Sequence, residues 1–255
     1  MNRPMLRPMA LAVVVTVLVA GCGGDDDGGG GGDGGGAADP LAALATAAEK
    51  TAASESYRAE FSMQSDLEGQ QVTFIGVGTF SADSSRGRLE GRMDAGRGLM
   101  GFEAIALDGV MYIKGDEIPV PSGKEWIKLK DPPTSTLSPS EFAAFLRDSE
   151  GVKNVGTEDI RGERATHFRG PLDLEKLAEK SGPDIVERLR RSPEANDLEF
   201  MIDMWVAQDG LPSRITANVS MPGRVRGSME ATSDILEYDV EVDVKKPPAD
   251  TVASP

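Results

Sequence analysis

The chain is constrained most strongly by an alternation of apolar and polar residues that begins at residue 57. In the segment 57–64, Tyr57, Ala59, Phe61 and Met63 alternate with polar side chains. Successive side chains of a β-strand point to opposite faces, so the period of two predicts a strand with one buried face.

The same kind of pattern recurs along the chain and predicts a large antiparallel sheet. Asp108-Gly109 and Asp209-Gly210 are typical hairpin turns, and Arg161-Gly162 marks a third hairpin. In the last predicted strand, alternate residues from Leu236 to Val244 are expected to face inward. Consecutive hairpins predict a sheet of about ten strands, and a sheet of that size usually curls. Further strands are predicted at 72–77, 99–107, 110–113, 125–129, 152–160, 165–170, 198–206, 215–219, 225–231 and 236–244.

Helices interrupt this pattern in three places. Asp39-Pro40 predicts the start of an opening helix that ends near Ser54. The segment 138–141 reads Ser-Pro-Ser-Glu and resembles a capping box, and a helical pair is predicted over 174–189. The predicted fold class is therefore α+β, with a large curled antiparallel sheet, or half-barrel, whose concave face is covered by helices.

A sheet covered in this way can enclose a cavity between its concave face and the helices. Small residues along the early strands would leave room there, although the same glycines can also serve twist, bulges and turns. These glycines are Gly76, Gly78, Gly87, Gly91, Gly98 and Gly101. Large apolar side chains are candidates to line the cavity, although core packing explains each of them equally well. These candidates are Phe61, Met63, Phe74, Met93, Phe102, Phe142, Phe145, Phe200 and Met204.

The amino terminus has the features of an export signal. Arg3 and Arg7 precede the apolar run 9–20, and Gly21-Cys22 follows it directly. Cys22 is the only cysteine and is expected to carry a lipid anchor, while the alternative is an ordinary secretory signal with a chance cysteine. No second cysteine accompanies it as a metal ligand or disulfide partner.

The segment after Cys22 is expected to be a flexible tether. Residues 23–36 are only glycine and aspartate, a composition that cannot build a core. The predicted organisation is a signal peptide at 1–21, the lipidated cysteine and tether at 22–38, one domain at 39–248 and a C-terminal tail at 249–255.

The net charge of the chain limits the classes of partner that it is expected to bind. It holds 27 Lys and Arg residues against 42 Asp and Glu residues, a formal net charge of −15, which argues against nucleic acid as a partner.

No hydrolase, zinc or nucleotide motif occurs, so we expect no enzyme, no cofactor and no metal. His167 is predicted to be structural or superficial. Asp203, the one acid within an apolar strand, is predicted to point outward beside Trp205.

Several segments together resemble the actinobacterial envelope lipoproteins of the LppX and LprG type, which are similar in fold to the LolA and LolB lipoprotein carriers. The resemblance lies in residues 108–113, 125–129, 156–158, the hairpin 204–212 and the acidic terminal strand before Pro247-Pro248. It implies a half-barrel whose sheet and helices enclose an apolar cavity for an acylated lipid or glycolipid. It carries over no individual binding residue.

The sequence therefore predicts an exported protein held on the outer face of the cell membrane through Cys22, where it binds and transports an apolar lipid or glycolipid. The alternative is a structural or regulatory envelope lipoprotein whose interior is fully packed and whose surface binds another exported protein.

Overall fold

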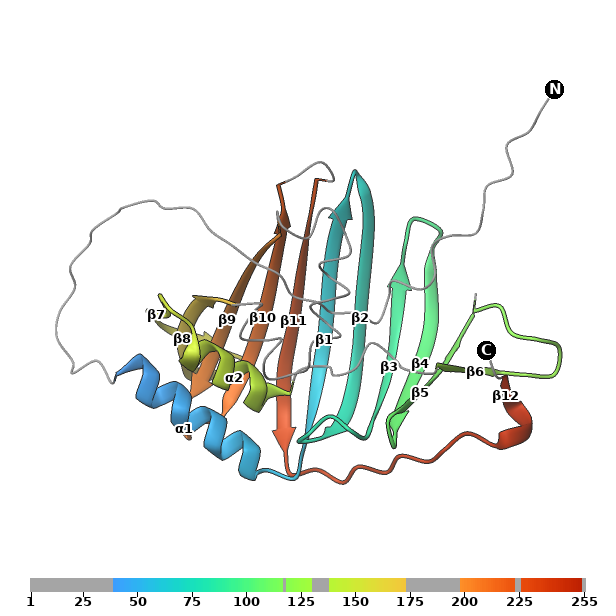
Figure 1. The fold of residues 1–255 in the computed structure, drawn as a ribbon, viewed down its shortest axis with the longest axis horizontal. Coiled ribbons are helices and arrows are strands. Elements are labelled where there is room, and N and C mark those ends of the chain that lie inside the picture. The colour runs from blue at the N-terminus through green and yellow to red at the C-terminus, as the bar shows by residue number, and fades with distance from the viewer. Residues whose placement is uncertain (1–38, 117, 130–137, 173–197, 223–225, 254–255) are drawn as a thin grey trace.

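The computed structural model describes residues 39–116, 118–129, 138–172, 198–222 and 226–253. Its main element is a single twelve-stranded sheet, ordered β12-β6-β5-β4-β3-β2-β1-β11-β10-β9-β8-β7. Figure 1 shows two meanders, β1–β6 and β7–β11, that meet where β1 pairs with β11. All described pairings are antiparallel except the one between β12 and β6. The strands are β1 (Ser56–Leu67), β2 (Gln70–Ser81), β3 (Gly87–Asp94), β4 (Leu99–Leu107), β5 (Val110–Gly115), β6 (Trp126–Leu129), β7 (Lys153–Ile160), β8 (Glu163–Pro171), β9 (Glu199–Ala207), β10 (Pro212–Met221), β11 (Gly227–Tyr238) and β12 (Val252–Ala253).

Two of the three predicted hairpin turns have positive φ at both central residues, and at Asp209-Gly210 only Gly210 does, with φ of 85°. Asp108 and Gly109 adopt φ values of 53° and 70° between β4 and β5, and Arg161 and Gly162 adopt 57° and 90° between β7 and β8. Positive φ at both central positions is the type I′ arrangement, which matches the twist of the flanking strands. These turns confirm the predicted antiparallel pairing.

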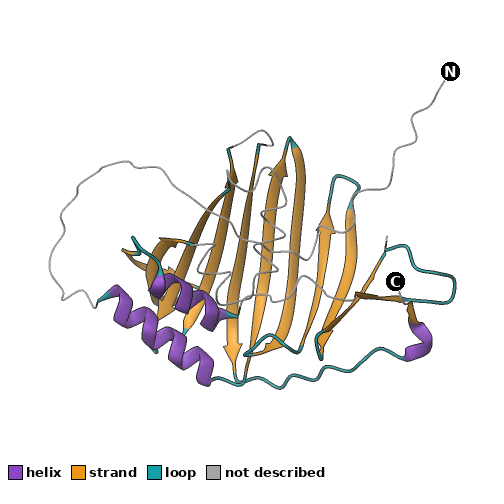
Figure 2. Ribbon diagram, viewed as in Figure 1, coloured by secondary structure: helices purple, strands orange, loops and turns teal. Residues whose placement is uncertain are grey.

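Two α-helices, α1 (Pro40–Ala53) and α2 (Pro139–Asp148), lie side by side on one face of the sheet, as Figure 2 shows. The Asp39 side chain caps α1, and Ser138 and Glu141 form the predicted capping box of α2. Their predicted starts are confirmed. The helical pair predicted over 174–189 lies outside the described residues.

The main core lies between these helices and β8–β11, β1 and β2. Leu44 and Ala47 of α1, Ala143 of α2 and Met204 of β9 are each 0% exposed in this cluster. We call the face of the sheet that carries this cluster the helix side, and the opposite face the outer side. The coarse prediction of a large, mostly antiparallel sheet with helices on one face is confirmed, while its curling into a half-barrel remains a prediction.

The end of the chain differs from the predicted last strand. Instead of separate strands at 225–231 and 236–244, one strand, β11, ends at Tyr238, and Asp239 turns the chain with φ of 56°. We call residues 239–248 the C-terminal strap. The inward alternation predicted up to Val244 is wrong because the strap leaves the sheet.

The strap covers part of the outer side instead. Val242 and Val244 pack with Ile105, Tyr112 and Trp126 in a second apolar cluster. Ile105 pairs with Arg88, while its neighbour Ala104 pairs with Leu89 of the helix side, so strand alternation places Ile105 on the outer side. Residues 249–253, predicted as a tail, form a 3-10 turn and β12, which pairs with β6.

Candidate functional site

The strand register places seven of the nine predicted lining residues on the helix side of the sheet. Met63 pairs with Phe74 across β1 and β2, and Phe74 pairs with Met93 across β2 and β3. Directly paired residues point to the same face of a sheet. By the same register Phe61 of β1, Phe102 of β4 and Phe200 and Met204 of β9 face this side, and Phe142 and Phe145 belong to α2.

Five of these nine residues belong to the main core. Phe145, Phe200 and Met204 are 4%, 1% and 0% exposed in the core cluster, and Phe61 and Phe142 pack against it. Their burial is explained by helix-to-sheet packing. Their role in ligand binding remains a prediction.

The other four lie beside that core, on β1–β4. Phe74 and Met93 are 9% and 8% exposed, and the rings of Phe74 and Phe102 lie 5.1 Å apart at 38°. Together with Met63 they extend the apolar helix side from the main core toward β4. Packing against the described helices does not explain the burial of these four predicted lining residues.

The glycines of the early strands are explained by aromatic packing. A Cβ on Gly78 would lie 2.5 Å from Cε2 of Phe80, and a Cβ on Gly91 would lie 2.5 Å from Cε2 of Phe74. Gly87 and Gly76 are covered by the same two rings. The rings therefore lie flat on the strands, so these four glycines do not open the lining as a cavity would need. Gly98 adopts a φ of 101° in the connection between β3 and β4.

A hollow of about 510 Å³ crosses β9, β10, β11, β1 and β2 near their ends. The lining residues whose side chains point to the helix side form one row across the five strands. The residues before and after each of them along its strand point to the outer side, because successive side chains of a strand alternate between the two faces. The helix-side row is Phe200, Val219, Met229, Ser65 and Val72. Phe200 and Val219 also belong to the main core, and Met229 packs against it. The hollow therefore continues the apolar core toward the ends of the strands.

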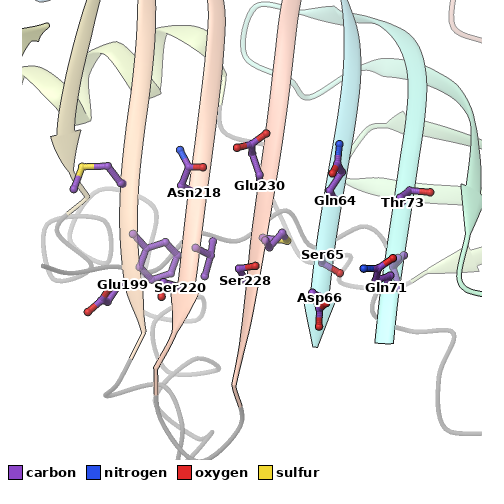
Figure 3. A pocket seen from close by; sticks show the side chains of 15 residues that line it. Gln64, Ser65, Asp66, Gln71, Thr73, Glu199, Asn218, Ser220, Ser228 and Glu230 are labelled. Carbon is purple, nitrogen blue, oxygen red and sulfur yellow. The ribbon is translucent and has the colours of Figure 1, made fainter. Parts of the chain in front are cut away.

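Most of the residues that flank this row are polar, and the strand register directs their side chains to the outer side of the sheet. Figure 3 shows them distributed across all five strands. They are Gln64, Asp66, Gln71, Thr73, Glu199, Asn218, Ser220, Ser228 and Glu230. The apolar row is therefore the part of the hollow that can contact an apolar ligand on the helix side.

A polar network on the outer side was missed by the sequence analysis. Asp203, only 1% exposed, accepts hydrogen bonds from Arg169 Nε at 2.7 Å and from Asn218 Nδ2 at 3.0 Å. His167 Nε2 lies 2.5 Å from Oδ1 of Asp203, and Nδ1 lies 2.8 Å from Oε1 of Glu158. Asp203 does lie on the same side as Trp205, but it is buried and paired. It does not simply point outward to solvent.

The network is held together by an aromatic stack. The rings of His167 and Trp205 lie 4.2 Å apart at 18°, and Trp205 Nε1 donates to Oε2 of Glu158 at 3.1 Å. This bond is the main cause that lowers the pKa of Glu158, and the hydrogen bond with His167 adds to it. No buried polar side-chain atom among the described residues lacks a hydrogen-bond partner, so packing and mutual hydrogen bonding account for the network.

Two tyrosines on the helix side are also perturbed by burial. Desolvation raises the pKa of Tyr57 to about 12 and also raises the pKa of Tyr238. Tyr57 makes a hydrogen bond with Ser84 at 3.2 Å, and Tyr238 donates to the carbonyl of Pro212 at 2.9 Å. Both hydroxyls therefore stay neutral in the folded protein and act as structural groups.

Cys22, the signal segment and the tether lie outside the described residues. Within the part of the chain that the structure describes, no helix has the length and apolar character needed to cross a membrane.

Comparison with known proteins gives a relative in sequence and several neighbours in structure. No protein-family model matches the chain. A Streptomyces griseus protein described as "Uncharacterized 31.2 kDa protein in rplA-rplJ intergenic region" is 33% identical over 120 residues. The match covers 45% of this chain and 38% of that relative.

The structural neighbours include LppX, one of the lipoproteins that the sequence resembles. LppX of Mycobacterium tuberculosis has a TM-score of 0.49 and 16% identity, over 81% of this chain and 98% of that one. LprF of Mycobacterium bovis has a TM-score of 0.48 and 12% identity, over 82% and 96%. A LolA superfamily protein of Nitrosomonas europaea has a TM-score of 0.32 and 10% identity, over 83% and 96%.

Proposed function

We propose that this chain is an exported lipoprotein that binds an apolar ligand, such as an acylated lipid or glycolipid, on the helix side of its sheet and carries it through the cell envelope. The observation that carries the proposal is the hollow, because its apolar row shares Phe200 and Val219 with the main core. An acyl chain lying there would be buried against Phe200, Val219, Met229 and Val72.

The size of the hollow suits this role. Ligand sites occupy roughly 300 to 1,000 Å³, and the hollow of about 510 Å³ falls within that range. Each methylene taken out of water contributes about 0.8 kcal/mol, so even a short acyl segment would bind measurably. Met63, Phe74, Met93 and Phe102 extend the apolar surface beyond the hollow.

The lipid anchor gives such a carrier its location. An acyl group on Cys22, followed by the glycine and aspartate tether, would keep the domain at the outer face of the membrane, where apolar ligands reside. Metabolic labelling with an alkyne fatty acid tests this point: the label is expected on the wild-type protein and absent from Cys22→Ser. Labelling that persists in the variant would contradict an anchor on Cys22.

Native mass spectrometry tests ligand binding directly. The mature protein, purified from its own host, is expected to carry a co-purifying lipid, and Ser65→Phe, which places a ring in the hollow, is expected to lose it. Ser62→Phe is the matched control, because Ser62 lies on the same strand but is exposed on the outer side. Repeated absence of lipid from the wild-type protein would contradict the proposal.

A second candidate function is binding of another exported protein. It is favoured by β7, an edge strand of the sheet on which seven of eight residues are exposed, with Val155 51% exposed. Such an edge can accept an added strand. A photo-crosslinking residue at Val155, compared with one at Ser62, tests this in cells. A discrete crosslinked protein specific to position 155 would favour the second function.

A further inference from the structure

The β7–β8 hairpin folds over the outer side of the sheet. Arg161, in the turn of this hairpin, forms an ion pair with Glu60 of β1 at 2.8 Å, although three strands lie between β8 and β1 in the sheet. Ile160 and Ala165, on either side of the turn, form an apolar cluster with Trp205 of β9, which is only 9% exposed. The hairpin therefore covers the outer side of β9, and its tip reaches across to β1.

The imidazole of His167 joins this hairpin to the sheet below it. Nδ1 lies 2.8 Å from Oε1 of Glu158 on β7, and Nε2 lies 2.5 Å from Oδ1 of Asp203 on β9. A carboxylate oxygen only accepts hydrogen bonds, so both ring nitrogens must donate, and only the protonated imidazolium has two N–H groups. A neutral imidazole would direct a lone pair at one of the two carboxylates and lose that bond.

Both carboxylates have further donors. Arg169, on the same strand as His167, donates to both oxygens of Asp203, and Asn218 of β10 donates to Oδ2. The hydrogen bond from Trp205 Nε1 is the main cause that lowers the pKa of Glu158, so this group stays ionised to lower pH than an ordinary glutamate. The two acids therefore act as acceptors toward the imidazole.

The charges joined by these contacts balance when the imidazole is protonated. Arg214 of β10 lies over the Trp205 ring, 5.9 Å from its centroid, and pairs with Asp234 of β11. A neutral imidazole would leave one negative charge without compensation in a network whose central acid is buried. The connected carboxylates are Glu158, Asp203 and Asp234, and the connected cations are Arg169, Arg214 and the imidazolium of His167.

We propose that His167 is a pH-sensitive switch that controls the β7–β8 hairpin. The imidazolium holds Glu158 of the hairpin to Asp203 of the sheet, and its deprotonation as pH rises releases the hairpin from the outer side. The stabilisation is therefore present while the imidazole is protonated and is lost at higher pH. Release uncovers Trp205 and frees a hairpin that carries the edge strand β7. This switch is independent of lipid binding on the helix side.

The burial of the two acids decides which bond is lost on deprotonation. The side chain of Glu158 is 48% exposed and can turn to water, whereas that of Asp203 is 2% exposed and cannot. The remaining proton of a neutral His167 therefore stays on Nε2, facing Asp203, and Nδ1 loses its contact with Glu158. The hairpin is released because Glu158 is its polar link to the imidazole.

Two measurements on the mature protein test the switch. His167 is the only histidine of the chain, so nitrogen NMR of its ring reports its protonation directly from pH 5 to pH 10. Both nitrogens are expected to be protonated at pH 5, and Nδ1 is expected to lose its proton as pH rises. Opening of the hairpin is measured by acrylamide quenching in a Trp126→Phe background, where Trp205 is the only tryptophan.

The quenching of Trp205 should follow the protonation of Nδ1. Loss of a hydrogen bond between charged groups should increase the open population by about tenfold or more. The quenching constant is therefore expected to rise severalfold, with the same pH midpoint as the NMR titration of Nδ1.

Three variants separate the switch from a general effect of pH. Glu158→Gln introduces an amide that can donate to a neutral Nδ1 and accept from Trp205, so its hairpin should stay closed across the whole range. His167→Gln cannot bridge both carboxylates, so its quenching should be high and independent of pH. Arg161→Gln is the matched control, because it removes an ion pair between half-exposed side chains at the hairpin tip and should keep the wild-type pH dependence.

A quenching constant that does not change with pH in the wild-type protein would overturn the proposal, as would an equal rise in His167→Gln. An Nδ1 without a proton at pH 5 would overturn it as well. If circular dichroism shows that His167→Gln does not fold, Glu158→Gln decides the question, since the same rise as in wild type would contradict release through the contact with Glu158.

Discussion

His167 and Asp203 meet across β8 and β9 with 2.5 Å between Nε2 and Oδ1, and both side chains are buried, at 5% and 1% exposure. The same carboxylate is held by Arg169 and Asn218, so three side chains converge on one buried acid. A buried acid of this kind is stabilised only while its partners remain in place.

Asp203→Asn is therefore expected to destabilise the protein. The amide keeps the shape but removes the charge and presents a donor to groups that already donate, and breaking a buried pair costs about 3 to 5 kcal/mol. For a domain of this size about 1 kcal/mol shifts Tm by roughly 2 to 4 °C, so thermal melting should show a fall of about 6 °C or more.

Asp243→Asn is the control for this variant, because Asp243 pairs with Lys245 at the surface, with side-chain exposures of 64% and 82%. A change of at most about 0.5 kcal/mol is expected there. An Asp203→Asn protein as stable as the control would show that the buried network contributes little.

The lowered pKa of Glu158 predicts a pH dependence of stability. The hydrogen bond from Trp205 and the contact with His167 favour the carboxylate in the folded state, so its stabilisation is present above the ordinary pKa of 4.5 and lost as pH falls through the lower folded value. Glu158→Gln should therefore melt below wild type at pH 7, and the two curves should converge at low pH. A constant difference in Tm between pH 7 and pH 3 would refute this assignment.

The packing of Phe80 on Gly78 predicts coupling between the two positions. Gly78→Ala would bring a Cβ within 2.5 Å of Phe80 Cε2 and is expected to cost about 1 to 3 kcal/mol, measured by urea denaturation. Phe80→Leu should reduce that cost, with a coupling energy of at least about 0.5 kcal/mol in the double-mutant cycle. Gly101→Ala, where a Cβ would meet only the side chain of Asp116, should be tolerated better. Additive costs for Gly78 and Phe80 would argue against the ring contact.

The C-terminal strap predicts a protease-sensitive variant. Val244 is 8% exposed in the cluster with Tyr112 and Trp126, so Val244→Asp places a charge in apolar surroundings and should release the strap. Losing the burial of one valine costs about 1.5 kcal/mol, which corresponds to a roughly tenfold larger population of the released strap. Trypsin is therefore expected to cleave after Lys245 at least about tenfold faster in Val244→Asp than in wild type. Asp243→Ala leaves the apolar contacts intact. Equal cleavage rates for the two variants would contradict the docking of Val244.

Local patterns in the sequence were sufficient for most elements of the fold. The turn residues at Asp108-Gly109 and the capping box at Ser138 and Glu141 depend on neighbours a few positions away, and the structure has both as predicted. The alternation at Tyr57 to Met63 likewise predicted the side of β1 that faces the core. Sequence analysis was wrong beyond Tyr238, because alternating residues can pack against a sheet without joining it.

The candidate site was predictable only in part. The predicted lining residues of β1–β4 do share one face, since strand alternation and hairpin order together determine it. The hollow was not predictable, because it depends on β1 pairing with β11, two strands far apart in the chain that bring Ser65 beside Met229.

The sequence by itself thus determined what short-range chemistry controls: the turns, the helix starts, the apolar side of each strand and the lipid-anchor signal at Cys22, whose use remains a prediction. Only the tertiary structure decided which distant side chains meet. It placed Phe80 over Gly78, buried Asp203 against His167 and brought Phe200, Val219 and Met229 into one row at the hollow. Such contacts depend on long-range strand pairing and packing, which local patterns do not specify.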